Sequence, residues 1–164
     1  MLLVLSFMSF ACNSTDGTES SSTEGPPLDV ELQVASSANL EDPVEFGLVV
    51  TNIGTVSTRF NLPGTKANGF SGSVEFTVRD SDDRDVWTYS KRNQFLQGSV
   101  QEVRLAPGEE LVITYEWDGL DSEANPIPAG TYSVTAVLKG TGAENGQDFT
   151  VSSETRQIEI ALTG

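Results

Sequence analysis

The segment ELVITYEW, residues 110–117, decides the fold. Apolar side chains occupy every second position of this segment: Leu111, Ile113, Tyr115 and Trp117. Successive side chains of a β-strand point to opposite faces, so a period of two predicts a strand with one face in a core. An amphipathic helix needs an apolar period of about 3.6 residues, and no window of comparable length in the sequence has it.

The same alternation recurs along the chain from Leu28 onward, with Gly, Pro, Asn and Asp between the segments. These further segments are LDVELQV (28–34), PVEFGLVV (43–50), TRFNL (58–62), SVEFTV (73–78), DVWTY (85–89), VQEVRL (100–105), TYSVTAVL (131–138) and RQIEIAL (156–162). Many short strands separated by turn residues predict an all-β fold, an antiparallel immunoglobulin-like two-sheet sandwich over residues 28–164. In PAGTYSV, we expect Tyr132 to brace a corner by a hydrogen bond to the backbone.

The composition excludes several classes of function. The 164 residues carry 24 Asp and Glu against nine Lys and Arg, a formal net charge of −15, which disfavours binding to nucleic acid. The sequence has no histidine and one cysteine. These counts exclude Ser-His-Asp and Cys-His catalytic groups, His-ligated zinc and an intrachain disulfide. We expect a monomeric protein without cofactor or metal, and not an enzyme.

The N-terminal segment differs in composition from the rest of the chain. Residues 1–11, MLLVLSFMSFA, are apolar, uncharged and too short to span a bilayer, as in a signal peptide. Cys12 follows the small residue Ala11, an arrangement that resembles the lipobox of bacterial lipoproteins, in which the cysteine carries the lipid. Residues 12–27 are rich in Ser, Thr, Gly and acidic residues, so we expect a disordered tether after the lipidated cysteine.

This reading places the protein in the cell envelope, anchored to a membrane through the lipid on Cys12. Asn13 follows the cysteine, in place of the aspartate that favours inner-membrane retention in many lipoproteins. If the source has two membranes, we expect the outer one, with the domain in the periplasm or outside the cell.

Four motifs in register resemble the BsuPI family, the intracellular proteinase inhibitor domains of bacteria. They are VWTYSKRNQFLQG (86–98), VRLAPGEE (103–110), EWDGLD (116–121) and PIPAGTY (126–132). The residues that carry the resemblance are Trp87, Tyr89, Ser90, Phe95, Pro107, Gly108, Trp117, Asp118, Pro128, Gly130 and Tyr132. The resemblance implies an immunoglobulin-like sandwich and inhibition of an intracellular serine protease. Most of these residues are of types that build a fold, either large apolar anchors or turn formers.

Two acidic segments and one basic segment are the remaining site candidates. DSDDRD (80–85) lacks the glycine and closing glutamate of a calcium loop, so we interpret it as a solvated hairpin turn. DGLDSEANP (118–126) is interpreted as a charged connection, with a calcium site as the alternative. Lys91, Arg92 and Asn93 lie in the one local cluster of positive charge and form the candidate partner-binding loop.

Three functions remain open at this point. The first is a lipid-anchored module that binds a protein or peptide through loops or a strand edge. The second is a serine protease inhibitor acting in the periplasm or outside the cell. The third is a structural accessory subunit of an envelope complex.

Overall fold

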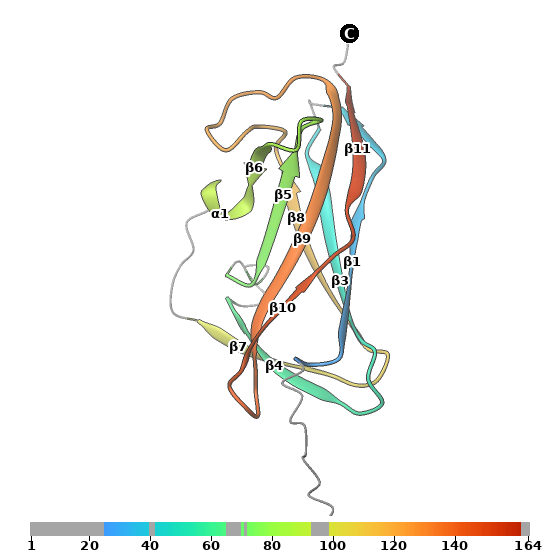
Figure 1. Cartoon of the computed structure of the whole chain (residues 1–164), viewed down its shortest axis with the longest axis vertical. Coiled ribbons are helices and arrows are strands. Elements are labelled where there is room, and N and C mark those ends of the chain that lie inside the picture. Colours follow the sequence, from blue (N-terminus) through green and yellow to red (C-terminus); the bar gives the residue numbers. More distant parts are fainter. Residues whose placement is uncertain (1–24, 40–41, 65–69, 71, 93–98, 162–164) are drawn as a thin grey trace, which may run out of the picture.

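Eleven strands and one helical turn follow one another along the described chain. The structure is a computed structural model that describes residues 25–39, 42–64, 70, 72–92 and 99–161. The elements are β1 (Leu28–Val34), β2 (Ser37–Asn39), β3 (Val44–Asn52), β4 (Thr58–Pro63), β5 (Val74–Arg79), β6 (Asp85–Thr88), α1 (Tyr89–Arg92), β7 (Val100–Leu105), β8 (Glu110–Trp117), β9 (Gly130–Gly142), β10 (Asp148–Ser152) and β11 (Arg156–Ala161). The chain is thus the predicted all-β immunoglobulin-like sandwich of two sheets (Figure 1).

The first sheet has three antiparallel strands in the order β1-β3-β8. The second sheet is built around the long strand β9. The first part of β9 pairs with β11 and β5, and its last part pairs with β10 and β4. Strand β7 extends this sheet beyond β4, and β6 extends it beyond β5. The short strand β2 pairs with β11 in parallel, so the predicted antiparallel pairing holds for every described pair except this one.

Aromatic rings fill the space between the sheets. Phe46 of β3 lies 5.8 Å from Trp117 of β8 and 6.0 Å from Trp87 of β6, between ring centroids. Both tryptophans are buried, and their centroids are 5.9 Å apart. Burying such large side chains supplies much of the free energy of folding. Trp87, Tyr89, Trp117 and Tyr132, the described aromatic residues of the family motifs, therefore lie in the core, where the second sheet meets the first.

The connections gather at two ends of the sandwich. The proximal end is where the described chain begins; it carries the β3–β4 turn, the β7–β8 turn and the β9–β10 hairpin (Figure 1). The distal end carries the β5–β6 turn and the long β8–β9 loop, residues 118–129. Strand β9 runs from one end to the other, and its 13 residues span about 40 Å. Within the described ranges, no helix is long and apolar enough to cross a membrane.

Residues 25–27 adjoin the sandwich and are described, although they were predicted to belong to the tether. The N–H of Leu28 donates to the carbonyl of Pro26 at 2.8 Å, and the N–H of Ile53 donates to the carbonyl of Pro27 at 3.0 Å. These bonds fix the start of β1 against the β3–β4 turn. The predicted signal peptide, Cys12 and most of the tether lie outside the described residues.

Candidate functional site

The β8–β9 loop and α1 meet at the distal end, and together they form what we call the distal surface (Figure 1). The loop is held at its base by side chains of the family motifs. The indole Nε1 of Trp117 donates to the carbonyl of Leu120 at 2.8 Å. The hydroxyl of Tyr132 donates to the carbonyl of Pro128 at 2.7 Å, which confirms the predicted tyrosine brace. Both ends of the loop are therefore fixed to the core.

Asp121 organises the tip of the loop. Its Oδ1 accepts the backbone N–H groups of Glu123 and Asn125, each at 2.8 Å, and its Oδ2 accepts the side-chain amide of Asn125 at 3.2 Å. Ala124, between these two residues, has a φ of 69°, a left-handed conformation that is rare for alanine. Residues 123–126 are all exposed. The loop thus presents a short turn with a fixed backbone to solvent.

Arg92 joins α1 to this loop. Its Nη2 donates to Oδ2 of Asp118 at 2.7 Å, and its Nη1 donates to the carbonyl of Asp121 at 3.0 Å. The other end of α1 is held by Glu75, whose Oε1 accepts the N–H of Ser90 at 2.8 Å. The predicted basic loop is therefore a helical turn in its described part, Arg92 is a brace, and Lys91 is exposed. Asn93 and Phe95 lie outside the described residues.

Other described residues of the family motifs lie in the core, in a turn or at the start of a strand. Trp87 is buried in β6, and Tyr89 packs edge-on against Tyr115 with centroids 4.5 Å apart. Pro107 and Gly108 form the β7–β8 turn, in which Gly108 has a φ of 74° and the N–H of Glu109 donates to the carbonyl of Ala106. Gly130 begins β9. Burial raises the pKa of Tyr89 and of Tyr132 above the ordinary value of 10.0.

The acidic hairpin turn between β5 and β6 is closed by arginines. Oδ1 of Asp80 accepts the N–H groups of Asp82 and Arg84, and the guanidinium of Arg84 pairs with Asp80 at 2.8 Å and Asp82 at 2.9 Å. The side-chain bond from Arg84 holds the pKa of Asp80 below its ordinary value. Among the described residues there is no group of three or more His, Cys, Asp or Glu side chains placed to hold a metal ion.

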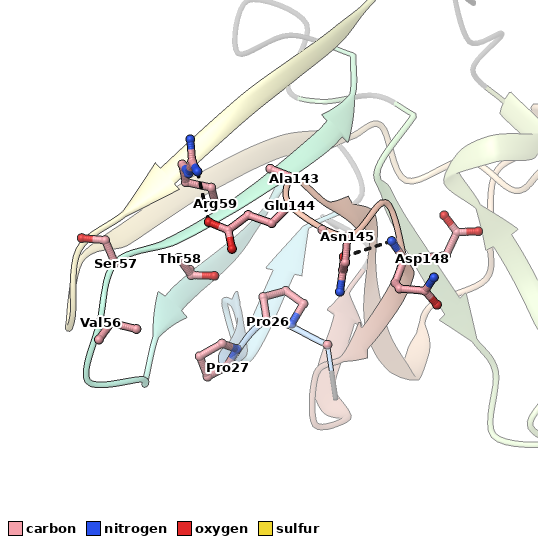
Figure 2. A pocket seen from close by; sticks show the side chains of 13 residues that line it. Pro26, Pro27, Val56, Ser57, Thr58, Arg59, Ala143, Glu144, Asn145 and Asp148 are labelled. Atoms are coloured by element: carbon pink, nitrogen blue, oxygen red, sulfur yellow. Dashed lines mark hydrogen bonds and ion pairs between the residues drawn. The ribbon is translucent and has the colours of Figure 1, made fainter. Parts of the chain in front are cut away.

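A hollow of about 310 Å³ lies at the proximal end, between the chain start, the β3–β4 turn and the β9–β10 hairpin (Figure 2). The guanidinium of Arg59 and the carboxylate of Glu144 meet across one side of it at 3.0 Å. Oδ1 of Asn145 accepts the N–H of Gln147 at 3.1 Å. Two of the three charged residues that line this hollow, Arg59 and Glu144, thus already bind one another. We take the distal surface as the stronger candidate site.

Sequence reasoning did not identify Asp121, Asn125 and Glu75 as the residues that shape the distal surface. The signal for Asp121 was present, because Asp and Asn side chains often accept the N–H groups of residues that follow them in turns. No comparable local signal exists for Glu75, which lies 15 residues before its partner Ser90.

Acid is expected to loosen the tip of the β8–β9 loop. Bonds from Asn125 and Glu123 lower the pKa of Asp121 below the ordinary 3.8. A lowered pKa means that the stabilisation is present above pH 3.8 and is lost as pH falls through the lower value. Carbon-13 NMR titration of the Asp121 carboxyl should give a midpoint below 3.8, with the Asn125 amide following it. An Asp121→Asn variant removes the titrating group, and a midpoint at or above 3.8 would contradict the proposed turn.

Comparisons with known proteins give one family and several solved structures. No curated protein sequence matches the chain. The CARDB domain of the PF1109 protein from Pyrococcus furiosus, solved in complex with di-metal ions, is 17% identical with a TM-score of 0.45, covering 84% of this chain and 96% of that one. The alkylpurine DNA glycosylase AlkC of Pseudomonas fluorescens is 11% identical with a TM-score of 0.45, covering 83% of this chain and 31% of that one.

A β-glucosidase from Listeria innocua is 18% identical with a TM-score of 0.39, and the match covers 81% of this chain and 16% of the glucosidase.

The family comparison covers most of the domain. Residues 28–143 match the model of the family described as BsuPI, intracellular proteinase inhibitor. This stretch is more than half of the chain and runs from β1 through the end of β9, so the chain belongs to the BsuPI family.

Proposed function

We propose that this chain is a lipid-anchored protein of a bacterial envelope, whose BsuPI-type sandwich binds a protein or peptide partner at the distal surface. The observation that carries the proposal is the β8–β9 loop, which exposes residues 123–126 while Trp117, Tyr132 and Arg92 hold it by hydrogen bonds to three of its carbonyls. A loop held in one conformation loses little entropy on binding, so more of its contact energy becomes affinity.

The position of the distal surface supports the same proposal. The described chain begins at the proximal end, and the distal surface lies at the opposite end of β9 (Figure 1). A domain tethered through its N-terminus would therefore present the β8–β9 loop and Lys91 away from the membrane. Lys91 and Glu123 both border a hollow of about 450 Å³ next to the loop, in which a partner side chain can bind.

A serine protease inhibitor acting outside the cytoplasm is the second candidate function. Two observations favour it: the family is an inhibitor family, and the β8–β9 loop is both exposed and held at its two ends. Interfaces between proteases and their inhibitors change little in backbone conformation on binding, so such a loop fits an inhibitor. The target would be a protease of the periplasm or the outside, because the proposed anchor removes the domain from the cytoplasm.

Intact mass of the protein from native membranes tests the anchor. A chain that begins at Cys12 and carries acyl groups supports the envelope assignment. An unmodified full-length chain would contradict it, and the search for a target would then move to intracellular serine proteases.

Titration of a subtilisin-like serine protease with the full chain tests the binding function. An inhibitor slows the protease in proportion to its concentration, up to one equivalent, and survives uncleaved. We expect Glu123→Lys at the tip of the loop to weaken the inhibition at least tenfold. Glu154→Lys, which makes the same charge change at an exposed position away from the loop, should leave it unchanged.

Capture of an envelope partner distinguishes the two candidates. A partner that is retained by the wild-type chain, lost with Glu123→Lys and retained with Glu154→Lys supports a binding module even if no protease is slowed. If the tip variant changes neither inhibition nor capture, the distal surface is not the binding site.

A further inference from the structure

Two large aliphatic side chains are exposed in one turn at the proximal end. Among the residues that the structure describes, Ile53, Val56, Val100 and Val112 are the exposed large hydrophobic side chains. Ile53 is 66% exposed and Val56 is 69% exposed, and both belong to the β3–β4 turn. Two such side chains within four residues form a small apolar patch on a protein whose formal net charge is −15.

The turn is held rigidly by Asn52, whose side chain is fully buried. Its Nδ2 donates to the carbonyls of Val56 at 2.9 Å and Leu105 at 3.0 Å, and its Oδ1 accepts the N–H of Gly54 at 2.9 Å. Every hydrogen-bonding group of the amide is thus used to fix the turn or to join it to β7. Ile53 and Val56 are therefore displayed by a fixed scaffold, and a mobile loop does not explain their exposure.

The start of the described chain lies directly against this turn. A Cβ on Gly54 would meet Pro27 at 2.6 Å, so only glycine allows this approach. Hollows of about 310 and 540 Å³ adjoin Pro26 and Pro27, and Val56 lines the first while Ile53 lines the second. The two exposed aliphatic side chains thus border the point at which the chain leaves the described part of the domain.

The length of chain beyond this point limits what can lie opposite the turn. Residues 13–24 separate Cys12 from Gly25, and a flexible linker of 12 residues has a typical end-to-end distance of about 20 Å. A lipid on Cys12 would hold a bilayer surface at a typical distance of about 20 Å from Gly25, which lines the same hollows as Ile53 and Val56. A bilayer surface takes up aliphatic side chains that are exposed to water.

We infer that the β3–β4 turn inserts Ile53 and Val56 into the surface of the bilayer that holds the anchor. The inference rests on the proposed lipidation of Cys12. It gives the domain a fixed orientation, with the proximal end on the lipid and the distal surface pointing away from the membrane. Contact at this turn gives the domain a second attachment to the bilayer, in addition to the lipid anchor, and this attachment needs no partner protein.

The charges at the proximal end predict which lipid headgroups favour insertion. The guanidinium of Arg59 is paired with Glu144, and Glu109 and Asp148 are exposed at the same end. With a net charge of −15, the protein gains nothing from anionic headgroups. We therefore expect insertion into zwitterionic phosphatidylcholine bilayers, and weaker insertion as anionic lipid is added.

The sequence allows the insertion to be measured at a single site. Cys12 is the one cysteine of the chain, and acylation would block its thiol, so a cysteine introduced elsewhere takes a thiol-reactive fluorophore alone. The full lipidated chain carrying Val56→Cys, labelled with the fluorophore NBD, is reconstituted in phosphatidylcholine vesicles that contain doxyl-labelled lipid. We expect the doxyl lipid to quench this label several-fold more strongly than the same label on Glu123→Cys, at the distal surface.

The Glu123→Cys label is the matched control, because NBD itself favours a bilayer. Adding Ile53→Asp to the Val56→Cys chain should reduce the quenching toward that of the control. Equal quenching at residues 56 and 123 on an acylated chain would overturn the inference alone. A shift in the emission of the label at 56 without quenching would indicate protein contact and would also overturn it. A chain whose Cys12 is unacylated takes two labels, which overturns the anchor and the inference together.

Discussion

Replacing Trp117 by alanine is expected to lower the free energy of unfolding by about 3–5 kcal/mol. The indole is fully buried at the end of β8 and lies 5.8 Å from Phe46 and 5.9 Å from Trp87, between ring centroids. Its removal leaves a cavity in the centre of the aromatic core, where the surrounding sheets cannot close in completely. It also removes the hydrogen bond to the carbonyl of Leu120, which holds the base of the β8–β9 loop.

Urea denaturation followed by circular dichroism measures this loss without depending on tryptophan fluorescence. Val112→Ala is the matched control on the same strand: Val112 is 52% exposed, so its truncation should change stability by no more than about 0.5 kcal/mol. Trp117→Phe keeps a ring but loses the bond to Leu120, and should fall between the two. If Trp117→Ala were no more harmful than Val112→Ala, the described core would be wrong.

The strands were predictable because each half-buried strand records its two environments in its own sequence. In β8 the outward positions are polar apart from Val112, and the inward positions are apolar. Strands β1 and β7 also have the predicted bounds. The alternation is weaker in β3, where Gly47 and Val49 on the outer face are also buried. Its strand type was still evident, since a run of apolar residues between turns is typical of a central strand.

Two strands were not predicted, for different reasons. Strand β2 has three residues, Ser37–Asn39, and owes its existence to pairing with β11, which is more than 100 residues later. No local pattern can encode such a partner. Strand β10 does alternate, with Phe149 and Val151 between polar residues. Five residues close to a glycine-rich turn are a weak signal, however, and the strand is specified mainly by its pairing with β9.

The distal surface shows the same division between local and distant signals. The tyrosine brace was predictable, because Tyr132 and Pro128 are four residues apart and lie in one motif. The role of Arg92 was not, since Asp118 is 26 residues away and the sequence shows only a basic residue in a basic cluster. A charged residue beside a turn can be a free cation or a brace, and only its partner decides which.

Asn52, like Arg92, has a partner far away in the sequence, because its side chain binds the carbonyl of Leu105. Changing Asn52 to aspartate is expected to lower the free energy of unfolding by about 3–5 kcal/mol at neutral pH. The two side chains have nearly the same shape, so packing is unchanged. The amide Nδ2 donates to the carbonyls of Val56 and Leu105, whereas a carboxylate would place a buried negative charge against those two oxygens. Among the described residues, the one N–H that donates to this side chain is that of Gly54, which already binds Oδ1.

The pH dependence of this loss separates the buried charge from a change in packing. The two carbonyls favour the uncharged carboxyl, so the pKa of the new aspartate in the folded state is raised above its unfolded value. The stability of the Asn52→Asp variant relative to wild type is therefore greatest at low pH, and it falls as pH rises through the raised pKa. Urea unfolding of both proteins at matched pH values should show the difference shrinking toward pH 4, because the protonated carboxyl can donate one of the two bonds.

Asn145→Asp is the control, since Asn145 is exposed and its Oδ1 accepts a bond from Gln147 that a carboxylate can also accept. It should change stability by no more than about 0.5 kcal/mol at any pH in this range. A loss at Asn52 that does not vary with pH would contradict the burial of a charge.

In the lipidated chain, Asn52→Asp should also weaken the quenching of a label at residue 56, because the amide of Asn52 holds the turn that displays Ile53 and Val56. That joint outcome would connect the stability of one buried amide to the orientation of the whole domain on its membrane.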